Sequence, residues 1–123
     1  MQKILSVLFA AFRNSLNGFK KAGRDERAVR QELCLLVVSV PLACFIAPGW
    51  LMAVLLIGSL LIILAVELLN TGIEKLCDHV TPEHHPVIGY VKDLGSAAVL
   101  CTLLFAALVW GGTIIQFLAG RGS

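Results

Sequence analysis

The stretch LCLLVVSVPLACFIAPGWLMAVLLIGSLLIILAV, residues 33–66, decides the fold because it contains no charged residue. One membrane-spanning helix needs about 20 apolar residues, so this stretch is too long for a single straight span. The sequence APGW at 47–50 supplies a turn near its middle. A second uncharged run extends from 94 to 120. The sequence therefore predicts a helical hairpin in the membrane, followed by a third span.

The composition of the whole chain agrees with a membrane protein. Hydrophobic residues make up 58% of the 123 residues, charged residues only 15%, and the mean hydropathy is +0.87. These values lie far from those of a soluble globular domain. The net charge of +2 gives no support to nucleic acid as a partner. The basic residues are better suited to anionic lipid headgroups or to a phosphorylated ligand.

The predicted fold is an all-α membrane protein with one helix on the membrane surface and three membrane helices. The two halves of the first uncharged run are each slightly short for a span, so both helices must continue into their charged flanks. We predict the surface helix at 1–24 and the membrane helices at about 29–48, 50–74 and 92–118. No repeat divides the chain, and residues 1–123 are predicted to form a single domain.

The sequence of residues 1–24 predicts an amphipathic helix that lies on the membrane surface. Apolar side chains recur at helical spacing on one arc, and polar side chains occupy the opposite arc. A cleaved signal peptide is the alternative, but the apolar stretch is short and no A-x-A cleavage site follows. The apolar arc consists of Ile4, Leu5, Leu8, Phe9, Phe12, Leu16 and Phe19, and the polar arc of Arg13, Asn17, Lys20, Lys21 and Arg24.

Nearly all charged residues are predicted to lie on one side of the membrane, because a hairpin returns the chain to its starting side. The opposite side has only the turn at 47–50 and Arg121. The positive-inside rule makes the charged side, with the N-terminus, cytoplasmic. The basic residues that precede the first span are Lys3, Arg13, Lys20, Lys21, Arg24, Arg27 and Arg30.

The stretch VELLNTGIEK, residues 66–75, places polar side chains at the end of an apolar helix, where charge is costly. Glu67, Asn70 and Glu74, followed by Asp78, are spaced by three, four and four residues. On a helix they form one stripe. We infer a shared functional site at this stripe rather than charges that only mark the membrane boundary.

The residue types of the stripe indicate the chemistry of the site. Carboxylates and an amide suit Mg²⁺, which takes one or two carboxylates together with substrate phosphates. Lys92 would complement the phosphates, and a carboxylate within reach of a lipid hydroxyl would serve as general base. These parts fit phosphoryl transfer, and they also fit a cation pathway. Residues 77–90, with two prolines and three histidines, are predicted to form the only substantial loop on the charged side.

Four segments of the sequence carry a common pattern, namely RDERAVRQE (24–32), VELLNTGIEKLCD (66–78), PEHH (82–85) and KDLGSAAVL (92–100). They resemble the prokaryotic diacylglycerol kinase family, and the resemblance extends from about residue 10 to 110. It implies a small homotrimeric integral membrane enzyme with a surface helix and three spans in each subunit. Better-known members have a basic residue in place of Val7 and an aromatic one in place of Asn14, so no role is carried over to these positions.

The resemblance also implies a role for each matching residue. Glu67 matches the general base that takes the proton from the lipid hydroxyl as it attacks the γ-phosphate of ATP, and Asn70 matches an essential neighbour. Glu26 and Glu74 match the carboxylates that hold Mg²⁺. The residues matched to the nucleotide are Lys92, Asp93, Glu83, His84 and His85, and those matched to the lipid side are Glu32 and Ser96.

The function expected from this resemblance is ATP-dependent phosphorylation of diacylglycerol to phosphatidate at the inner membrane of a bacterium. An undecaprenol kinase is the nearest alternative, because members of the same family phosphorylate a long isoprenoid alcohol with the same motifs. A small cation channel or a structural membrane subunit is the alternative of another class. It predicts conductance without ATP turnover and gives no reason for Lys92 and Asp93 to follow a loop with histidines.

Overall fold

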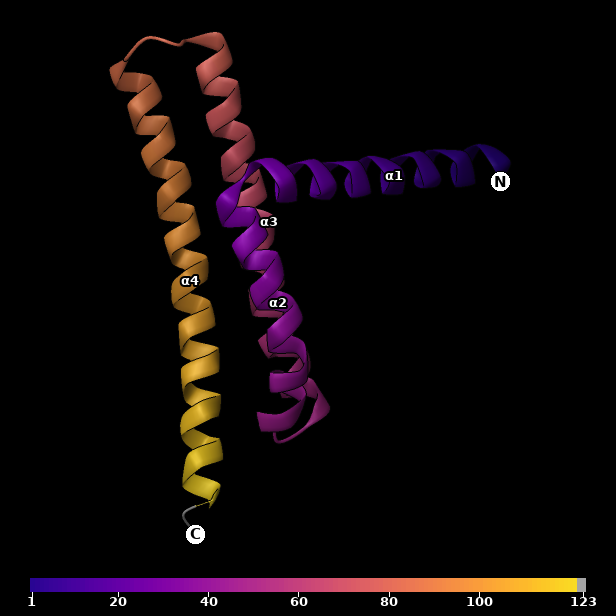
Figure 1. Cartoon of the computed structure of the whole chain (residues 1–123), viewed down its shortest axis with the longest axis vertical. Coiled ribbons are helices and arrows are strands. Elements are labelled where there is room, and N and C mark those ends of the chain that lie inside the picture. Colours follow the sequence, from indigo (N-terminus) through magenta and orange to yellow (C-terminus); the bar gives the residue numbers. More distant parts are fainter. Residues whose placement is uncertain (122–123) are drawn as a thin grey trace.

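The computed structural model describes residues 1–121, and these residues form four helices. Helices α2 (Arg27–Ile46), α3 (Trp50–Val80) and α4 (Pro86–Arg121) run alongside one another, whereas α1 (Gln2–Asp25) projects sideways from them (Figure 1). Helix α3 lies at the centre, because both α2 and α4 pack mainly against it. The all-helical prediction is confirmed for the described residues.

The junction between α1 and α2 is a single non-helical residue, Glu26, with an extended backbone. Its N–H still donates to the carbonyl of Ala22 at 2.8 Å, which completes the last turn of α1. The guanidinium of Arg30 folds back and donates to the carbonyls of Gly23 and Arg24 at 3.3 and 3.1 Å. These bonds satisfy carbonyl groups that every helix end leaves without an intrahelical partner. The direction of α1 is therefore fixed by local hydrogen bonds.

The turn predicted in APGW is present at residues 47–49, between α2 and α3. Proline and glycine end one helix and allow the next to begin, because proline restricts the preceding residue and lacks an N–H group. A buried apolar cluster of Ala43, Ile46 and Leu56 closes the hairpin. Trp110 of α4 donates its indole N–H to the carbonyl of Leu56 at 3.1 Å, which joins the third helix to this cluster.

The connection between α3 and α4 is much shorter than the sequence predicted. The expected loop at 77–90 is wrong in its extent, since only residues 81–85 lie outside helices. Helix α3 ends at Val80, beyond the predicted end of its span at 74, and α4 begins at Pro86 rather than near 92. Charged residues do not stop a helix; the break comes at Pro82, whose ring disfavours helical backbone at Thr81. Pro86 then opens α4, a position that proline favours.

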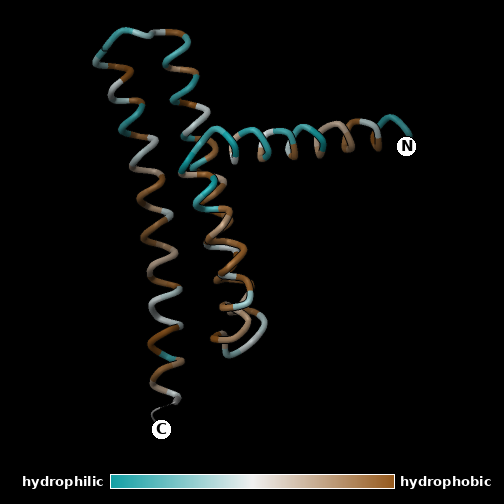
Figure 2. Tube along the Cα trace, in the orientation of Figure 1, coloured by the Kyte–Doolittle hydropathy of each residue, from teal (hydrophilic) through white to brown (hydrophobic). Residues whose placement is uncertain are grey.

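Helices α2, α3 and α4 are each long and apolar enough to cross a membrane. Figure 2 shows brown, hydrophobic residues along their lower parts, and teal, hydrophilic residues where α3 and α4 meet the 81–85 connection and at the junction with α1. Many large apolar side chains of these helices are exposed, including Val37, Leu69 and Leu108. Exposure of this kind is expected for a chain whose outer surface is covered by lipid or by other chains.

Candidate functional site

The polar end of α3 presents the stripe predicted from the sequence. Asn70 is buried, with 8% of its surface exposed, Glu67 and Glu74 are half-buried, and Asp78 is exposed. The Asn70 amide donates to a Glu74 carboxylate oxygen at 3.4 Å, a long hydrogen bond one helical turn apart. Because all four side chains lie on one rigid helix, their relative positions are set more firmly than they would be on a loop.

Carboxylates from three elements surround Glu67. Its charge is repelled by those of Glu74, on the same helix, and Glu26, at the α1–α2 junction. Glu32 of α2 in turn experiences the charge of Glu67, and one of its buried oxygens, Oε2, has no hydrogen-bond partner among the described residues. Like charges that are partly withdrawn from water are costly unless a cation joins them. We call Glu26, Glu32, Glu67 and Glu74 the carboxylate cluster.

Asn70 also packs directly against α4, at Gly95. A Cβ atom at Gly95 of α4 would overlap the Oδ1 atom of Asn70, so only glycine fits there in this arrangement. That Oδ1 atom is buried and accepts no hydrogen bond from the described residues. Small residues allow helices to approach closely in membranes. The sequence LGSAA at 94–98 supplies such small residues on α4, but the individual contact between Gly95 and Asn70 was not predicted.

Two ion pairs join other elements to α3 near the carboxylate cluster. Lys75 binds Glu26 with 2.9 Å between Nζ and Oε1, and Lys92 of α4 binds Asp78 with 2.8 Å between Nζ and Oδ1. The sequence predicted Lys92 as a phosphate partner, and in this structure its partner is a carboxylate. The sequence analysis gave Lys75 no role, because Lys75 lies off the stripe and its partner follows from the position of α1.

The remaining predicted site residues are exposed and lie apart from the carboxylate cluster. Glu83, His84 and His85 belong to the 81–85 connection, and Asp93 and Ser96 to α4. No hydrogen bond or ion pair joins them to the cluster within residues 1–121. His85 instead accepts a hydrogen bond from the N–H of Val87 at 3.1 Å and so caps the start of α4.

The residues that the structure describes contain no group of three His, Cys, Asp or Glu side chains placed to hold a metal ion by themselves. Two carboxylates that share a metal with substrate phosphates need no such group. Glu26 and Glu74 both border Glu67, so their donor oxygens and their excess negative charge fit a divalent cation. In this structure one of the Glu26 oxygens, Oε1, is ion-paired with Lys75.

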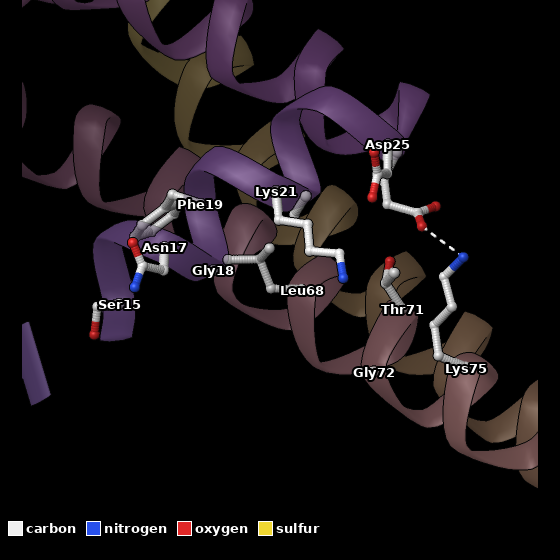
Figure 3. A pocket seen from close by; sticks show the side chains of 12 residues that line it. Ser15, Asn17, Gly18, Phe19, Lys21, Asp25, Leu68, Thr71, Gly72 and Lys75 are labelled. Carbon is white, nitrogen blue, oxygen red and sulfur yellow. Dashed lines mark ion pairs between the residues drawn. The ribbon is translucent and has the colours of Figure 1, made fainter. Parts of the chain in front are cut away.

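A cavity of about 940 Å³ separates the second half of α1 from α3, next to the carboxylate cluster. At the junction end of the cavity, Lys75 of α3 is ion-paired with Glu26 beside Asp25, and Lys21 of α1 extends toward the cavity further from the junction (Figure 3). The α3 residues that line it, Leu68, Thr71, Gly72 and Lys75, lie on a face beside the stripe of Glu67 and Asn70, and the α1 residues are Ser15, Asn17, Gly18, Phe19, Lys21, Ala22 and Asp25.

Comparison with known proteins assigns this arrangement to a family. The sequence model of prokaryotic diacylglycerol kinases matches residues 13–114, which include the whole carboxylate cluster.

Individual relatives agree with this match. The chain is 36% identical to a diacylglycerol kinase of Haemophilus influenzae over 110 residues, which cover 89% of this chain and 93% of the relative. It is 38% identical to one of Escherichia coli over 96 residues, or 78% and 79% of the two chains. A diacylglycerol kinase of Helicobacter pylori is 39% identical over 104 residues, or 85% and 81%. A kinase with three membrane-spanning helices thus accounts for both the sequence and the fold, and the chain belongs to the prokaryotic diacylglycerol kinase family.

Proposed function

We propose that the protein transfers the γ-phosphoryl group of ATP to the primary hydroxyl of diacylglycerol and so forms phosphatidate. The observation that carries this proposal is the carboxylate cluster around Glu67 at the polar end of membrane-spanning helices. At this position a lipid hydroxyl held in the bilayer meets a water-soluble nucleotide. The names of the curated relatives support the same substrate class.

Glu67 is the proposed general base of the reaction. A base must lie within hydrogen-bond reach of the proton that it removes, and its carboxylate belongs to a helix that is fixed by packing on both sides. Asn70 lies about one helical turn beyond Glu67, and its amide donates a hydrogen bond to Glu74. This bond restrains the carboxylate of Glu74. Little covalent chemistry is needed in phosphoryl transfer, so positioning of this kind contributes most of the rate enhancement.

Mg²⁺ is the proposed metal, and Glu26 and Glu74 are its proposed protein ligands. If held by these carboxylates, the ion would supply positive charge to offset the negative charge that develops during phosphoryl transfer. Support comes from the repulsion among the carboxylates, which a divalent cation would relieve. Glu74 is already restrained by Asn70, whereas Glu26 is held by Lys75.

The nucleotide and the lipid are assigned to opposite sides of the carboxylate cluster. Lys92 and Asp93 are the proposed phosphate-side contacts of ATP, supported by the ion pair with Asp78 that holds the Lys92 ammonium group against α3. The exposed connection with Glu83, His84 and His85 is assigned to the adenosine end. Glu32 and Ser96 are assigned to the lipid. The unpartnered buried oxygen of Glu32 supports this assignment, because a lipid hydroxyl would supply its missing donor.

We further propose a homotrimer of single-domain subunits in the bacterial inner membrane, with α1 on the cytoplasmic surface. Apolar side chains of α1, including Leu5, Phe9 and Phe12, are more than half exposed and would enter the headgroup region. Basic residues of α1 and of the start of α2 support a cytoplasmic location. A closed trimer would cover part of the exposed apolar surface of α2, α3 and α4.

The first test of the proposed function is a transfer assay with the purified protein in detergent. Diacylglycerol and undecaprenol are offered in parallel with ATP, once with Mg²⁺ and once with EDTA. We expect Mg²⁺-dependent phosphatidate and little undecaprenyl phosphate. The reverse preference would identify the isoprenoid kinase, and ion conductance without transfer to either lipid would favour a channel.

Replacement of Glu74 by glutamine tests the metal assignment. The change removes one charged ligand and keeps the shape of the side chain, so the Mg²⁺ concentration for half-maximal activity should rise about 10-fold or more. Asp25→Asn is the matched control, since it removes one negative charge from an exposed residue beside Glu26. A Mg²⁺ titration that is the same for Glu74→Gln and the wild type would exclude Glu74 as a ligand.

A further inference from the structure

The ion pair between Lys75 and Glu26 joins two elements that lie far apart in the sequence. Lys75 belongs to α3 and Glu26 to the α1–α2 junction, and 2.9 Å separates Nζ from Oε1. Lys75 extends along the edge of the cavity to reach the carboxylate, as the dashed line in Figure 3 shows. An ammonium group at this distance occupies a lone-pair direction that a metal ion would otherwise use.

The charges around Lys75 explain why it takes this position. Glu26 and Glu74 both repel Glu67, and Glu67 in turn repels Glu32, so the cluster carries more negative charge than its own residues neutralise. Lys75 is the one cation paired with the cluster within residues 1–121. Its ammonium group therefore supplies positive charge that Mg²⁺ would supply when bound.

The exposure of the pair makes it easy to displace. The Lys75 side chain is 69% exposed and that of Glu26 is 26% exposed. Ion pairs near water contribute little to stability, because the separated charges are well hydrated. A divalent ion has twice the charge of the ammonium and can bind several oxygens of the cluster at once. Lys75 thus competes with a metal ion without blocking it.

We propose that Lys75 is a tethered cation that holds Glu26 when no metal is bound and that competes with divalent metal for its carboxylate. The proposal rests on the proposed function, which makes Glu26 a metal ligand. Lys75 lowers the affinity of the site for divalent metal. In return it neutralises part of the negative charge of the cluster and keeps the α1–α2 junction attached to α3 between metal-binding events.

The test measures binding of Mn²⁺ alone, without nucleotide or lipid, from the electron paramagnetic resonance signal of free Mn²⁺. Mn²⁺ takes the same oxygen ligands as Mg²⁺. Lys75→Met removes the charge and keeps most of the stem, and we expect the dissociation constant to fall by roughly 3- to 10-fold. Lys75→Arg keeps a competing cation and should stay close to the wild type.

Lys21→Met is the matched control, because Lys21 lines the same cavity and pairs with no carboxylate in the described chain. Its dissociation constant should change less than 2-fold, which separates direct competition from a general change in charge. An unchanged or higher constant in Lys75→Met overturns the proposal, and so does an equal fall in Lys21→Met.

Glu26→Gln distinguishes failure of this inference from failure of the metal assignment. If Glu26 is a ligand, the glutamine variant binds Mn²⁺ more weakly and the Lys75→Met change no longer alters binding in that background. Weaker binding in Glu26→Gln with no effect of Lys75→Met refutes the competition alone. Unaltered binding in Glu26→Gln refutes both Glu26 as a ligand and the competition.

Discussion

Replacing Glu67 by glutamine lowers the turnover of lipid phosphorylation by about 10²- to 10⁴-fold, the contribution that a general base makes to proton transfer. The amide cannot accept the proton of the attacking hydroxyl, yet it has nearly the same volume as the carboxylic acid. The variant also removes one charge from a cluster of repelling carboxylates, so its fold should be at least as stable as that of the wild type. Initial rates with saturating diacylglycerol and ATP measure the effect.

Two further measurements identify the origin of the loss in Glu67→Gln. Thermal unfolding in detergent and the elution volume of the oligomer should match the wild type, which excludes a folding defect. Glu67→Asp keeps a base but withdraws it by one methylene group. Its turnover should lie between that of the wild type and that of Glu67→Gln. Full activity in Glu67→Gln would remove Glu67 as the base and leave Glu32 as the next carboxylate to test.

Replacing Gly95 by alanine should be the most damaging change among the small residues of α4. The new methyl group would overlap the Asn70 amide oxygen, so the two helices must separate or Asn70 must move. Insertion of one methyl group into packed helices costs about 1–3 kcal/mol of unfolding free energy. Movement of Asn70 also releases Glu74, and we expect turnover to fall by about 10-fold or more.

Gly112→Ala is the control for Gly95→Ala, because it adds the same methyl group to the same helix where nothing lies within 4 Å. It should leave both stability and turnover close to wild type. The double variant Gly95→Ala with Asn70→Ala removes the overlap and should recover stability while turnover stays low. If the unfolding free energy and the turnover of Gly95→Ala both equal those of the wild type, the contact with Asn70 places no constraint on the site.

The helical hairpin was predictable because its signals are local. The uncharged run at 33–66 exceeds one span, and proline and glycine occur together only near its middle. The stripe of Glu67, Asn70 and Glu74 was predictable for the same reason, since helical periodicity alone brings these residues onto one face. Family resemblance then supplied a role for each position.

The contacts between helices were not predictable from the same signals. The loop between α3 and α4 was predicted too long because the prolines, histidines and glycine of 77–90 were read as one loop, whereas only residues 81–85, between Val80 and Pro86, lie outside helices. The approach of Gly95 to Asn70 depends on how far α4 is shifted along α3. The pairing of Lys75 with Glu26 depends on the direction in which α1 leaves the bundle, which one backbone conformation at Glu26 decides.

Because the single extended residue Glu26 joins α1 to α2, a small rotation there would move the far end of α1 a long way. A helix of 24 residues is about 36 Å long, so a rotation of about 10° at Glu26 would carry its far end through about 6 Å. The hydrogen bonds of Arg30 and the ion pair of Lys75 both act within a few residues of the pivot. A small change in the backbone angles of Glu26 would therefore displace the apolar side chains near residue 5 far more than the residues beside the junction.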